Sequence, residues 1–408
     1  MKKFLLPLAL VSSVAFAVEP IPENENPRLF TEGKAEITSL LEVDRLGLNS
    51  GATSLDLWSG SYWPHYQGAL GVRYRDPKFA AIIKDKSQFD KFKDLKVKLP
   101  TYSYSGRENL LSPAEKYDLI VGDPKMSLTK YAWELGEDSA TFGKVKTWRG
   151  ICDGWASAAQ KMPRPVRNVI LKTPSGMPVT FFPEDIKALG SLLYARNQGP
   201  VIFLGERCEG GLFSGKGCKE TNPGTFHRAL VNRVGNMKKT FIADVSPGGD
   251  VWNYPVQSYK LTYYNVFNDE DSETVKEAME IFDKKKFSKS DKRHKLTYAV
   301  VGVTAVVNYM DMRPANLLST DGVENDKIMT KTYYYDLELD RNLNVIGGES
   351  FSKDLPDFIW APNDKTYPTS DAEEQAEAGA SLVTLSQQAA KSGQPISTVV
   401  QKLFEAAK

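Results

Sequence analysis

The stretch GICDGWASA, residues 150–158, decides how the rest of the chain is interpreted. Apolar residues from position 151 to position 162 recur at helical spacing, and Pro163 and Pro165 follow. This pattern predicts a short helix with Cys152 in its first turn. Unpaired backbone N–H groups and the helix dipole stabilise a thiolate there, so the position favours a nucleophile over a structural cysteine.

The first seventeen residues, MKKFLLPLALVSSVAFA, have the layout of a secretory signal peptide. A basic head precedes an apolar stretch and a small-x-small cleavage site, and the apolar stretch is too short for a membrane span. Because no later run of about 18 apolar residues occurs, we expect no membrane span in the mature chain. We therefore expect a secreted or periplasmic protein.

Composition indicates a large globular core without a polyanionic partner. Of the 408 residues, 41% are hydrophobic and 11% aromatic. Removal of Lys2 and Lys3 with the signal leaves 50 basic against 51 acidic residues, so charge gives no reason to expect nucleic acid as a partner. Helical patterns alternate with β-branched and aromatic strands, which predicts an α+β fold.

The chain divides by composition into four parts. After the signal peptide at 1–17, residues 18–50 are expected to form a mobile leader or a docked helix, and possible removal as a pro-segment stays open. Residues 51–366 are expected to form the catalytic domain. The Ala-, Glu- and Gln-rich residues 367–408 are expected to form small helices outside the core.

Only three cysteines occur, an odd number for an exported chain. Cys208 and Cys218 lie ten positions apart in a glycine-rich loop, and an oxidising compartment favours their pairing. A bridge over so short a loop contributes about 3 kcal/mol. Cys152 is then the unpaired thiol and a candidate catalytic nucleophile, although a lone cysteine is more often a small buried hydrophobe.

A thiol nucleophile needs a base within reach. We interpret His294, in the basic run SDKRHKL, as part of a solvated face, and His65, in SYWPHYQG, as packed or hydrogen-bonded among aromatic residues. His227 lies in the first of two strand-like runs that flank Gly235-Asn236, a pair suited to a two-residue hairpin turn.

The hairpin register can be derived from that turn. With a two-residue turn, paired positions sum to 471, so His227 lies directly opposite Asp244 on one sheet face. A three-residue loop would separate the two residues, and the pair also fits a strand surface without a catalytic role. Together with Cys152, the pattern predicts a Cys–His–Asp triad.

At these residues the chain resembles the transglutaminase-like superfamily, in which a Gly-x-Cys-x-Gly-aromatic-Ala helix start precedes a strand His and a next-strand Asp. More narrowly it resembles the transglutaminase elicitor family of secreted proteins. Seven collinear stretches between about Tyr62 and Trp360 carry that resemblance: SYWPHYQG, LSPAEKYDLIVGD, CDGWA, VTFFPEDIKALGSLLYA, NPGTFHRALVNRVG, FIADVSPGGDVWNYPVQSYK and GGESFSKDLPDFIW.

The resemblance implies a papain-like core in which a catalytic Cys at a helix N-terminus packs on an antiparallel sheet that carries His and Asp. Within it, VWNYPVQSYK (251–260) is similar to the surface peptide that plants sense in that family. It departs from the familiar form at Tyr254 and Gln257-Ser258, and we infer no elicitor activity.

The implied reaction is transfer of a protein glutamine side chain to a lysine or other primary amine through a Cys152 thioester. His227 would move protons, Asp244 would orient its imidazole, and the Cys152 N–H would hold the oxyanion. Candidate indole donors to the oxyanion are Trp133 and Trp148, and candidate cleft walls are Trp155 and Trp252. Each of these tryptophans also fits a core position.

No cofactor is required by this chemistry. The resemblance leaves room for stimulation by calcium, but we assign no calcium ligands and expect no metal site. Residues 269–280 have acidic residues at EF-hand-like spacing, yet Thr274 replaces the glycine that such a loop needs. We interpret this segment as a capped acidic helix start that continues to about Lys286.

Two further functions stay open at this point. One is a cysteine hydrolase that uses the same triad on peptide or amide bonds. The other is a non-catalytic secreted recognition protein, although binding alone would need none of Cys152, His227 and Asp244.

Overall fold

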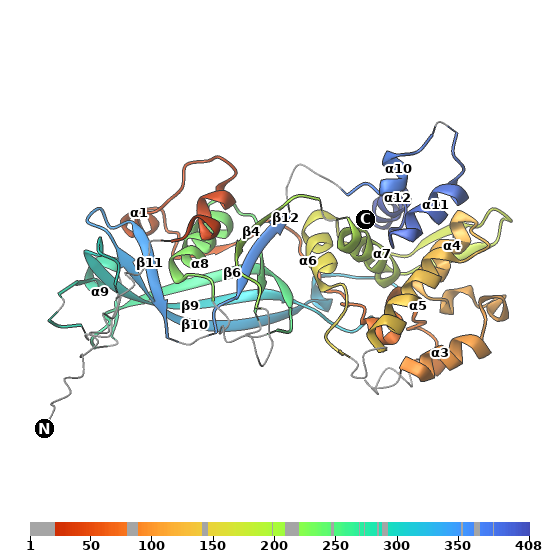
Figure 1. Cartoon of the computed structure of the whole chain (residues 1–408), viewed down its shortest axis with the longest axis horizontal. Helices are drawn as coiled ribbons and strands as arrows, with labels where there is room; N and C mark the ends of the chain where they lie inside the picture. Colours follow the sequence, from red (N-terminus) through yellow and green to blue (C-terminus); the bar gives the residue numbers. More distant parts are fainter. Residues whose placement is uncertain are drawn as a thin grey trace, which may run out of the picture.

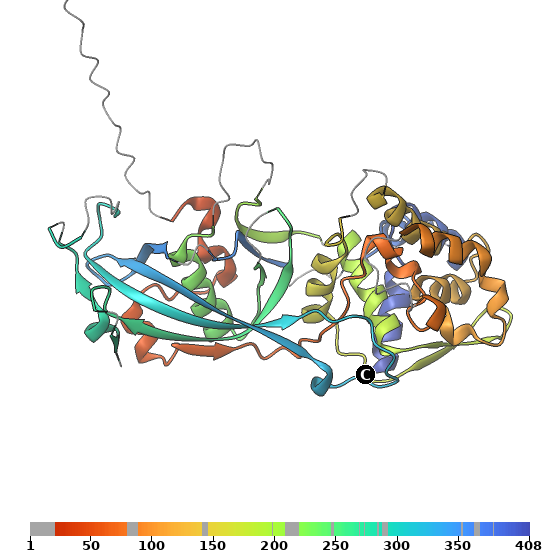
Figure 2. The ribbon, with the colours of Figure 1, turned by 90° about the horizontal axis from the view of Figure 1, so that it is seen from below.

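The computed structural model describes residues 21–408 except 80–88, 141–145, 198, 209–219, 246–248, 269, 273, 284, 288–292, 352–353, 363–367 and 378. The signal peptide therefore lies outside the described residues. Two lobes lie side by side along the long axis, one dominated by a sheet and one by helices (Figures 1 and 2). Each lobe has its own cluster of buried apolar side chains.

The sheet lobe is built on one antiparallel sheet, in which the main strands follow the order β11-β10-β9-β6-β5-β12-β4. Two long strands, β9 (Ala299–Asp311) and β10 (Lys327–Leu339), pair along their full length, as β-branched and aromatic composition predicts. The other strands are β1 (Ser50–Ala52), β4 (Val201–Gly205), β5 (Ile242–Asp244), β6 (Asn253–Tyr264), β7 (Asp271–Ser272), β8 (Glu280–Ile281), β11 (Val345–Ser350) and β12 (Phe358–Pro362).

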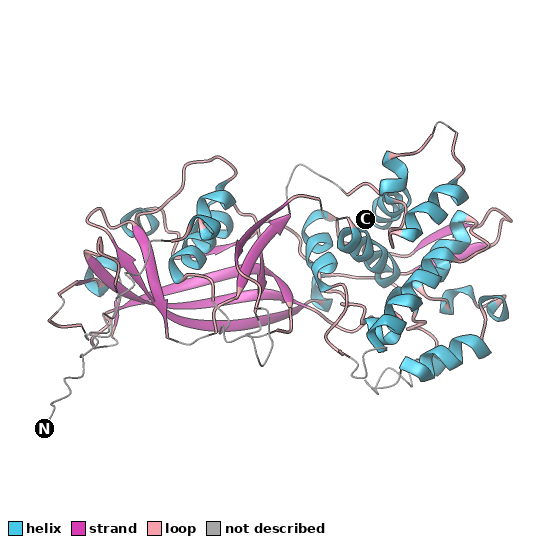
Figure 3. Cartoon of the chain, in the orientation of Figure 1, coloured by secondary structure: helices cyan, strands magenta, loops and turns pink. Residues whose placement is uncertain are grey.

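Helices cover one side of this sheet (Figure 3). They are α1 (Leu40–Arg45), α8 (Pro223–Ala229), the π-helical turn η7 (Leu230–Asn236) and α9 (Val275–Ala278). The N-terminal segment packs here as well, because Glu25 accepts a hydrogen bond from the Asn222 N–H and β1 pairs with β6. The described residues from position 21 onward form part of the sheet lobe, so the expectation of a mobile leader is wrong for them, and the alternative of a docked helix is found as α1.

The helical lobe contains a small two-stranded sheet, β2 (Val169–Lys172) with β3 (Pro178–Phe181). Its helices are α3 (Phe89–Lys98), α4 (Pro113–Val121), α5 (Ser127–Ala140), α6 (Cys152–Lys161), α7 (Pro183–Arg196), α10 (Asp371–Glu374), α11 (Leu382–Lys391) and α12 (Ser397–Ala407). The start of α4 was predictable from sequence, since Ser112 and Glu115 form a capping box with Pro113 at the first helical position.

The C-terminal helices belong to the core of the helical lobe. Val400, Leu403 and Phe404 of α12 are buried, and a Cβ on Gly190 of α7 would lie only 2.6 Å from the Phe404 ring. The expectation that residues 367–408 lie outside the core is wrong. Composition misled, because small Ala and polar Gln surround a regular apolar stripe.

Buried ion pairs join the lobes. The connection between β9 and β10 reaches the helical lobe, where Asp321 binds Lys187 of α7 at 2.6 Å and Arg313 at 3.1 Å. Asp321 and Lys187 are almost fully buried, so replacement of Asp321 by a neutral residue would leave buried positive charge without this partner. The boundary at which α6 meets the sheet is therefore fixed from both sides.

Candidate active site

Cys152 is the first residue of α6, at the boundary between the two lobes (Figure 1). The helix ends at Lys161, so the helix start and stop predicted around Cys152 are confirmed. The segment that precedes it is held by Tyr62, whose carbonyl accepts the Ile151 N–H at 2.7 Å. A Cβ on Gly150 would lie 2.3 Å from that carbonyl, so only glycine fits there.

Gly154 fixes how closely α6 approaches α7. A Cβ at this position would lie 2.0 Å from the Ser191 carbonyl and 2.6 Å from Cβ of Ala195. The two backbones can therefore touch only because residue 154 has no side chain. Both glycines of GICDGWASA thus serve the placement of the cysteine between them.

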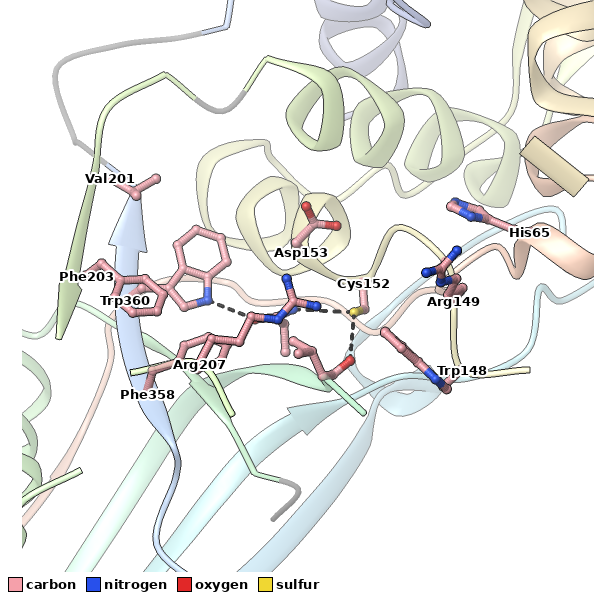
Figure 4. A pocket seen from close by; sticks show the side chains of 13 residues that line it. His65, Trp148, Arg149, Cys152, Asp153, Val201, Phe203, Arg207, Phe358 and Trp360 are labelled. Carbon is pink, nitrogen blue, oxygen red and sulfur yellow. Dashed lines mark hydrogen bonds between the residues drawn. The ribbon is translucent and has the colours of Figure 1, made fainter. Parts of the chain in front are cut away.

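The thiol opens into a cavity of about 480 Å³. Figure 4 shows His65 and Arg149 to one side of the sulfur, with Arg207, Phe203 and Trp360 to the other. Phe203 stacks on Phe358 with ring centroids 4.8 Å apart, which gives the cavity an aromatic wall. The lining residues are His65, Trp148, Arg149, Gly150, Cys152, Asp153, Val201, Phe203, Arg207, Val251, Asn253, Phe358 and Trp360.

The sulfur has two polar neighbours from the start of β6. The Asn253 amide Nδ2 donates to Sγ at 3.5 Å, and the thiol donates to the Val251 carbonyl at 3.8 Å (Figure 4). The segment that resembles the plant-sensed peptide therefore forms part of the wall of this cavity.

Burial controls the protonation of the thiol. Loss of water, followed by the nearby Asp153 charge, raises the pKa of Cys152 from 9.0 to about 11, although hydrogen bonds from Asn253 oppose the rise. Burial therefore opposes the stabilisation of a thiolate that the helix start is expected to give. The resting group at neutral pH is the thiol, and its reaction requires a base.

His65 is the histidine that shares the cavity with Cys152. Its backbone N–H donates to the Arg149 carbonyl at 2.9 Å, which ties it to the segment just before the cysteine. Burial, with the charges of Arg196 and Arg149, lowers the pKa of His65 to about 4, so the imidazole is neutral at pH 7. Its Nε2 is buried and meets no hydrogen-bond partner among the described residues.

His227 lies elsewhere, and the predicted hairpin is wrong. Residues 223–236 are helical, in α8 and η7, and His227 packs beneath the sheet with Nδ1 3.1 Å from the Tyr335 hydroxyl. Its ring also contacts Tyr263, which lies ten residues beyond Asn253 on β6. At about 3.3 Å per residue, the ten residues of β6 between Asn253, which contacts the thiol, and Tyr263, which contacts His227, span roughly 30 Å. This separation is too long for proton transfer between His227 and Cys152.

Asp244 does lie at the site, but not beside His227. It is on β5, as its strand position predicts, and faces Asn253 in the β5–β6 register. Its Oδ1 accepts the Trp252 N–H at 2.9 Å, and its charge contributes to the raised pKa of Cys152. Of the three residues predicted to act together, the structure brings together Cys152 and Asp244 only.

The four candidate tryptophans divide into one at the cavity and three away from it. Trp148 lines the cavity, and Arg149 lies 6.0 Å from its ring. Trp155 is fully buried and donates to the Trp58 carbonyl, so it is core and not a cleft wall. Trp252 packs edge-on against Tyr62 and is not among the lining residues.

Trp133, the fourth, lies on α5 and lines a different cavity. Lys96 lies 4.7 Å from its ring, and Gly68 and Gly71 pack against it. An oxyanion at Cys152 is therefore beyond its reach. Two residues that sequence reasoning did not single out, Asn253 and Trp360, lie at the cavity instead.

Cys152 is a free thiol, which agrees with its assignment as the odd cysteine. Cys218 lies outside the described residues, so the bridge from Cys208 to Cys218 stays a prediction. His294 is only 6% exposed, and the Glu338 carboxylate accepts its backbone N–H. The expectation that His294 lies on a solvated face is therefore wrong.

The acidic segment 269–280 contains a capped helix, but that helix is short. Thr274 caps α9 by accepting the Glu277 N–H at 3.3 Å, but the helix ends at Ala278 and not near Lys286. Residues 269 and 273 lie outside the described part of the chain, within which no three His, Cys, Asp or Glu side chains gather to bind a metal. Nor is any helix in that part long and apolar enough to cross a bilayer.

Comparison with known protein families identifies the family to which the chain belongs. The family model described as transglutaminase elicitor matches residues 35–388, which is most of the chain, and the protein belongs to that family. The resemblance inferred from the seven stretches is therefore confirmed.

Among solved structures, the chain is similar to the crystal structure of the GP42 transglutaminase from Phytophthora sojae. The TM-score is 0.60 at 21% identity, and the match covers 94% of this chain and 97% of the other. This likeness shows a shared mixed fold of helices and antiparallel sheet. No curated protein matches the chain.

Proposed function

We propose that the protein is a secreted transglutaminase, which joins glutamine side chains to lysine or other primary amines through a thioester on Cys152. The observation that carries this proposal is a free thiol at a helix start that shares one cavity with a neutral imidazole. Membership of the transglutaminase elicitor family supports the reaction type. The signal-like N-terminus and the elicitor family support an extracellular location.

In the first half-reaction, His65 takes the thiol proton, directly or through one water, as the sulfur attacks the glutamine carboxamide. The new S–C bond forms while the carbonyl π pair moves onto oxygen. When the carbonyl reforms, the C–N bond breaks, and the nitrogen takes the proton from the His65 imidazolium and leaves as ammonia. A primary amine then attacks the thioester, loses a proton to His65 and releases the cysteine.

Asp244 serves this site as a positioning residue rather than as the partner of an imidazole. By holding the Trp252 N–H, it fixes the turn that brings Val251 and Asn253 to the sulfur. With its pKa lowered to about 4, His65 is neutral at pH 7 and can therefore accept the thiol proton.

The aromatic wall favours amine transfer over hydrolysis. Phe203, Phe358 and Trp360 present apolar surface beside the thiol. Such a wall limits the access of water to a thioester, which an amine must attack first if an isopeptide is to form.

The test is incorporation of a labelled primary amine into a glutamine-containing protein by the purified mature chain. We expect incorporation that is lost in Cys152→Ala. Release of ammonia without incorporation would indicate a cysteine hydrolase instead. A folded protein that gives neither result would leave the recognition protein as the function.

A further inference from the structure

The side chain of Asn253 is fixed at both ends. Trp360 Nε1 donates to its Oδ1 at 2.8 Å, and its Nδ2 donates to Cys152 Sγ at 3.5 Å. An indole N–H can only donate, so the amide oxygen must face Trp360 and the NH₂ group must face the sulfur. Asn253 is 4% exposed and lines the cavity beside the thiol.

Both residues that set this geometry belong to the sheet. Asn253 opens β6 and pairs with Asp244 of β5, while Trp360 of β12 pairs with Ile242 of the same β5 strand. The donor is thus held by three adjacent hydrogen-bonded strands rather than by a loop. Such a donor is oriented before the substrate arrives, which is the condition under which a hydrogen bond stabilises a transition state most.

We propose that the Asn253 amide is the side-chain donor of the oxyanion hole, and that Trp360 is the positioning residue that fixes its orientation. This inference rests on the proposed acyl-transfer function. In the tetrahedral intermediate the oxyanion is bonded to the carbon attached to Sγ. An oxygen two bonds from the sulfur lies within reach of a nitrogen that already contacts that sulfur.

A second donor is available at the helix start. The Cys152 N–H belongs to the first turn of α6, where no intrahelical acceptor exists. As the S–C bond forms and the carbonyl electron pair moves onto oxygen, both N–H groups donate to the developing charge and neither loses its proton. Trp148, which also lines the cavity, stays a predicted donor.

Two assays on the same variants separate this role from simple support of the thiol. Alkylation of Cys152 by iodoacetamide requires the thiolate but forms no oxyanion. Amine incorporation requires the thiolate and also passes through an oxyanion. In Asn253→Ala we expect kcat for incorporation to fall about 10²- to 10³-fold, while the alkylation rate changes by less than about tenfold, roughly one pKa unit.

Two further variants keep the test valid if Asn253→Ala folds poorly. Asn253→Asp keeps the shape and the acceptor for Trp360 but presents an oxygen to the oxyanion, so it should lose at least as much kcat. Trp360→Phe removes only the indole donor and should give a smaller loss of the same kind. Asn268→Ala, at an exposed position on the sheet lobe, is the control and should match the wild type.

The inference is overturned if folded Asn253→Ala and Asn253→Asp incorporate amine within threefold of the wild type. It is equally overturned if both assays fall by the same factor, because Asn253 would then act on the thiol alone. A wild-type protein that alkylates normally but transfers no acyl group would overturn the proposed function together with this inference. That result differs from an active wild type with unaffected variants, which overturns the inference only.

Discussion

Replacement of His65 by Asn is the perturbation that separates the structural assignment of the base from the one that the sequence predicted. The Cys152 pKa of about 11 means that roughly one thiol in 10⁴ is ionised at pH 7 without help. A general base removes that limit, and its loss usually costs 10²- to 10⁴-fold in rate. We therefore expect kcat/KM of His65→Asn to fall by about that range at pH 7.

The pH profile gives the second part of the same prediction. With a His65 pKa near 4, the wild-type activity should lose its base only as the pH falls through about 4. In His65→Asn the rate should instead climb about tenfold per pH unit toward pH 11, as the thiol ionises without assistance. The assay is labelled-amine incorporation, measured as kcat/KM on protein whose fold is checked by circular dichroism.

His227→Gln is the matched control for this experiment. His227 is fully buried and hydrogen-bonded to Tyr335, so the change should lower stability by about 1–3 kcal/mol yet leave kcat/KM within threefold. The reasoning is refuted if folded His65→Asn stays within threefold of the wild type at pH 7. It is also refuted if His227→Gln loses as much activity as His65→Asn.

Two other predictions concern stability. Gly154→Ala should destabilise the fold by about 2 kcal/mol or more in chemical denaturation, because the added Cβ would meet the Ser191 carbonyl. The control Gly347→Ala places its Cβ in open space and should change stability by less than about 1 kcal/mol. Equal effects of the two substitutions would contradict the packing argument. Burial opposes the ionisation of Glu373, but hydrogen bonds from Ser370 and the α12 start outweigh it and lower the pKa to about 2. Its contribution is thus present above about pH 4.5 and lost as the pH falls through 2, and after allowance for partial exposure Glu373→Gln should cost about 1–2 kcal/mol at pH 7. Equal stability of the two proteins at pH 7 would contradict it.

The nucleophile helix was predictable because its signals are local. Periodic apolar residues and the stop at Pro163 define one short helix, and the structure places Cys152 at its start. The class of fold was likewise accessible, since long strands such as β9 and β10 carry β-branched and aromatic residues over many positions.

The histidine assignment failed for a physical reason. Asn222 caps α8 by accepting the Gly224 N–H, and Pro223 stands at its first position, so a helix start was readable in NPGTFHRAL. The Gly235-Asn236 pair suggested a hairpin because α8 and η7 are buried almost throughout, and an apolar run without a polar face does not reveal its period.

His65 could be found only through tertiary structure. It lies 87 positions before Cys152, and a backbone bond to Arg149 together with the glycine at 150 brings the two segments together. The sequence did contain one signal, since SYWPHYQG was among the stretches that carried the family resemblance. Spacing alone could not show that this histidine, and not His227, enters the cavity.

The proposed function requires that the Cys152 thiol is deprotonated by His65, an imidazole that precedes it in the chain. Mass spectrometry of enzyme quenched in acid, after incubation with a glutamine donor and no amine, tests it most directly. The account predicts that the peptide bearing Cys152 gains the mass of the donor less ammonia, and that this adduct is absent in His65→Asn at pH 7. Amine incorporation with no adduct on Cys152, or with the adduct on another residue, would contradict it.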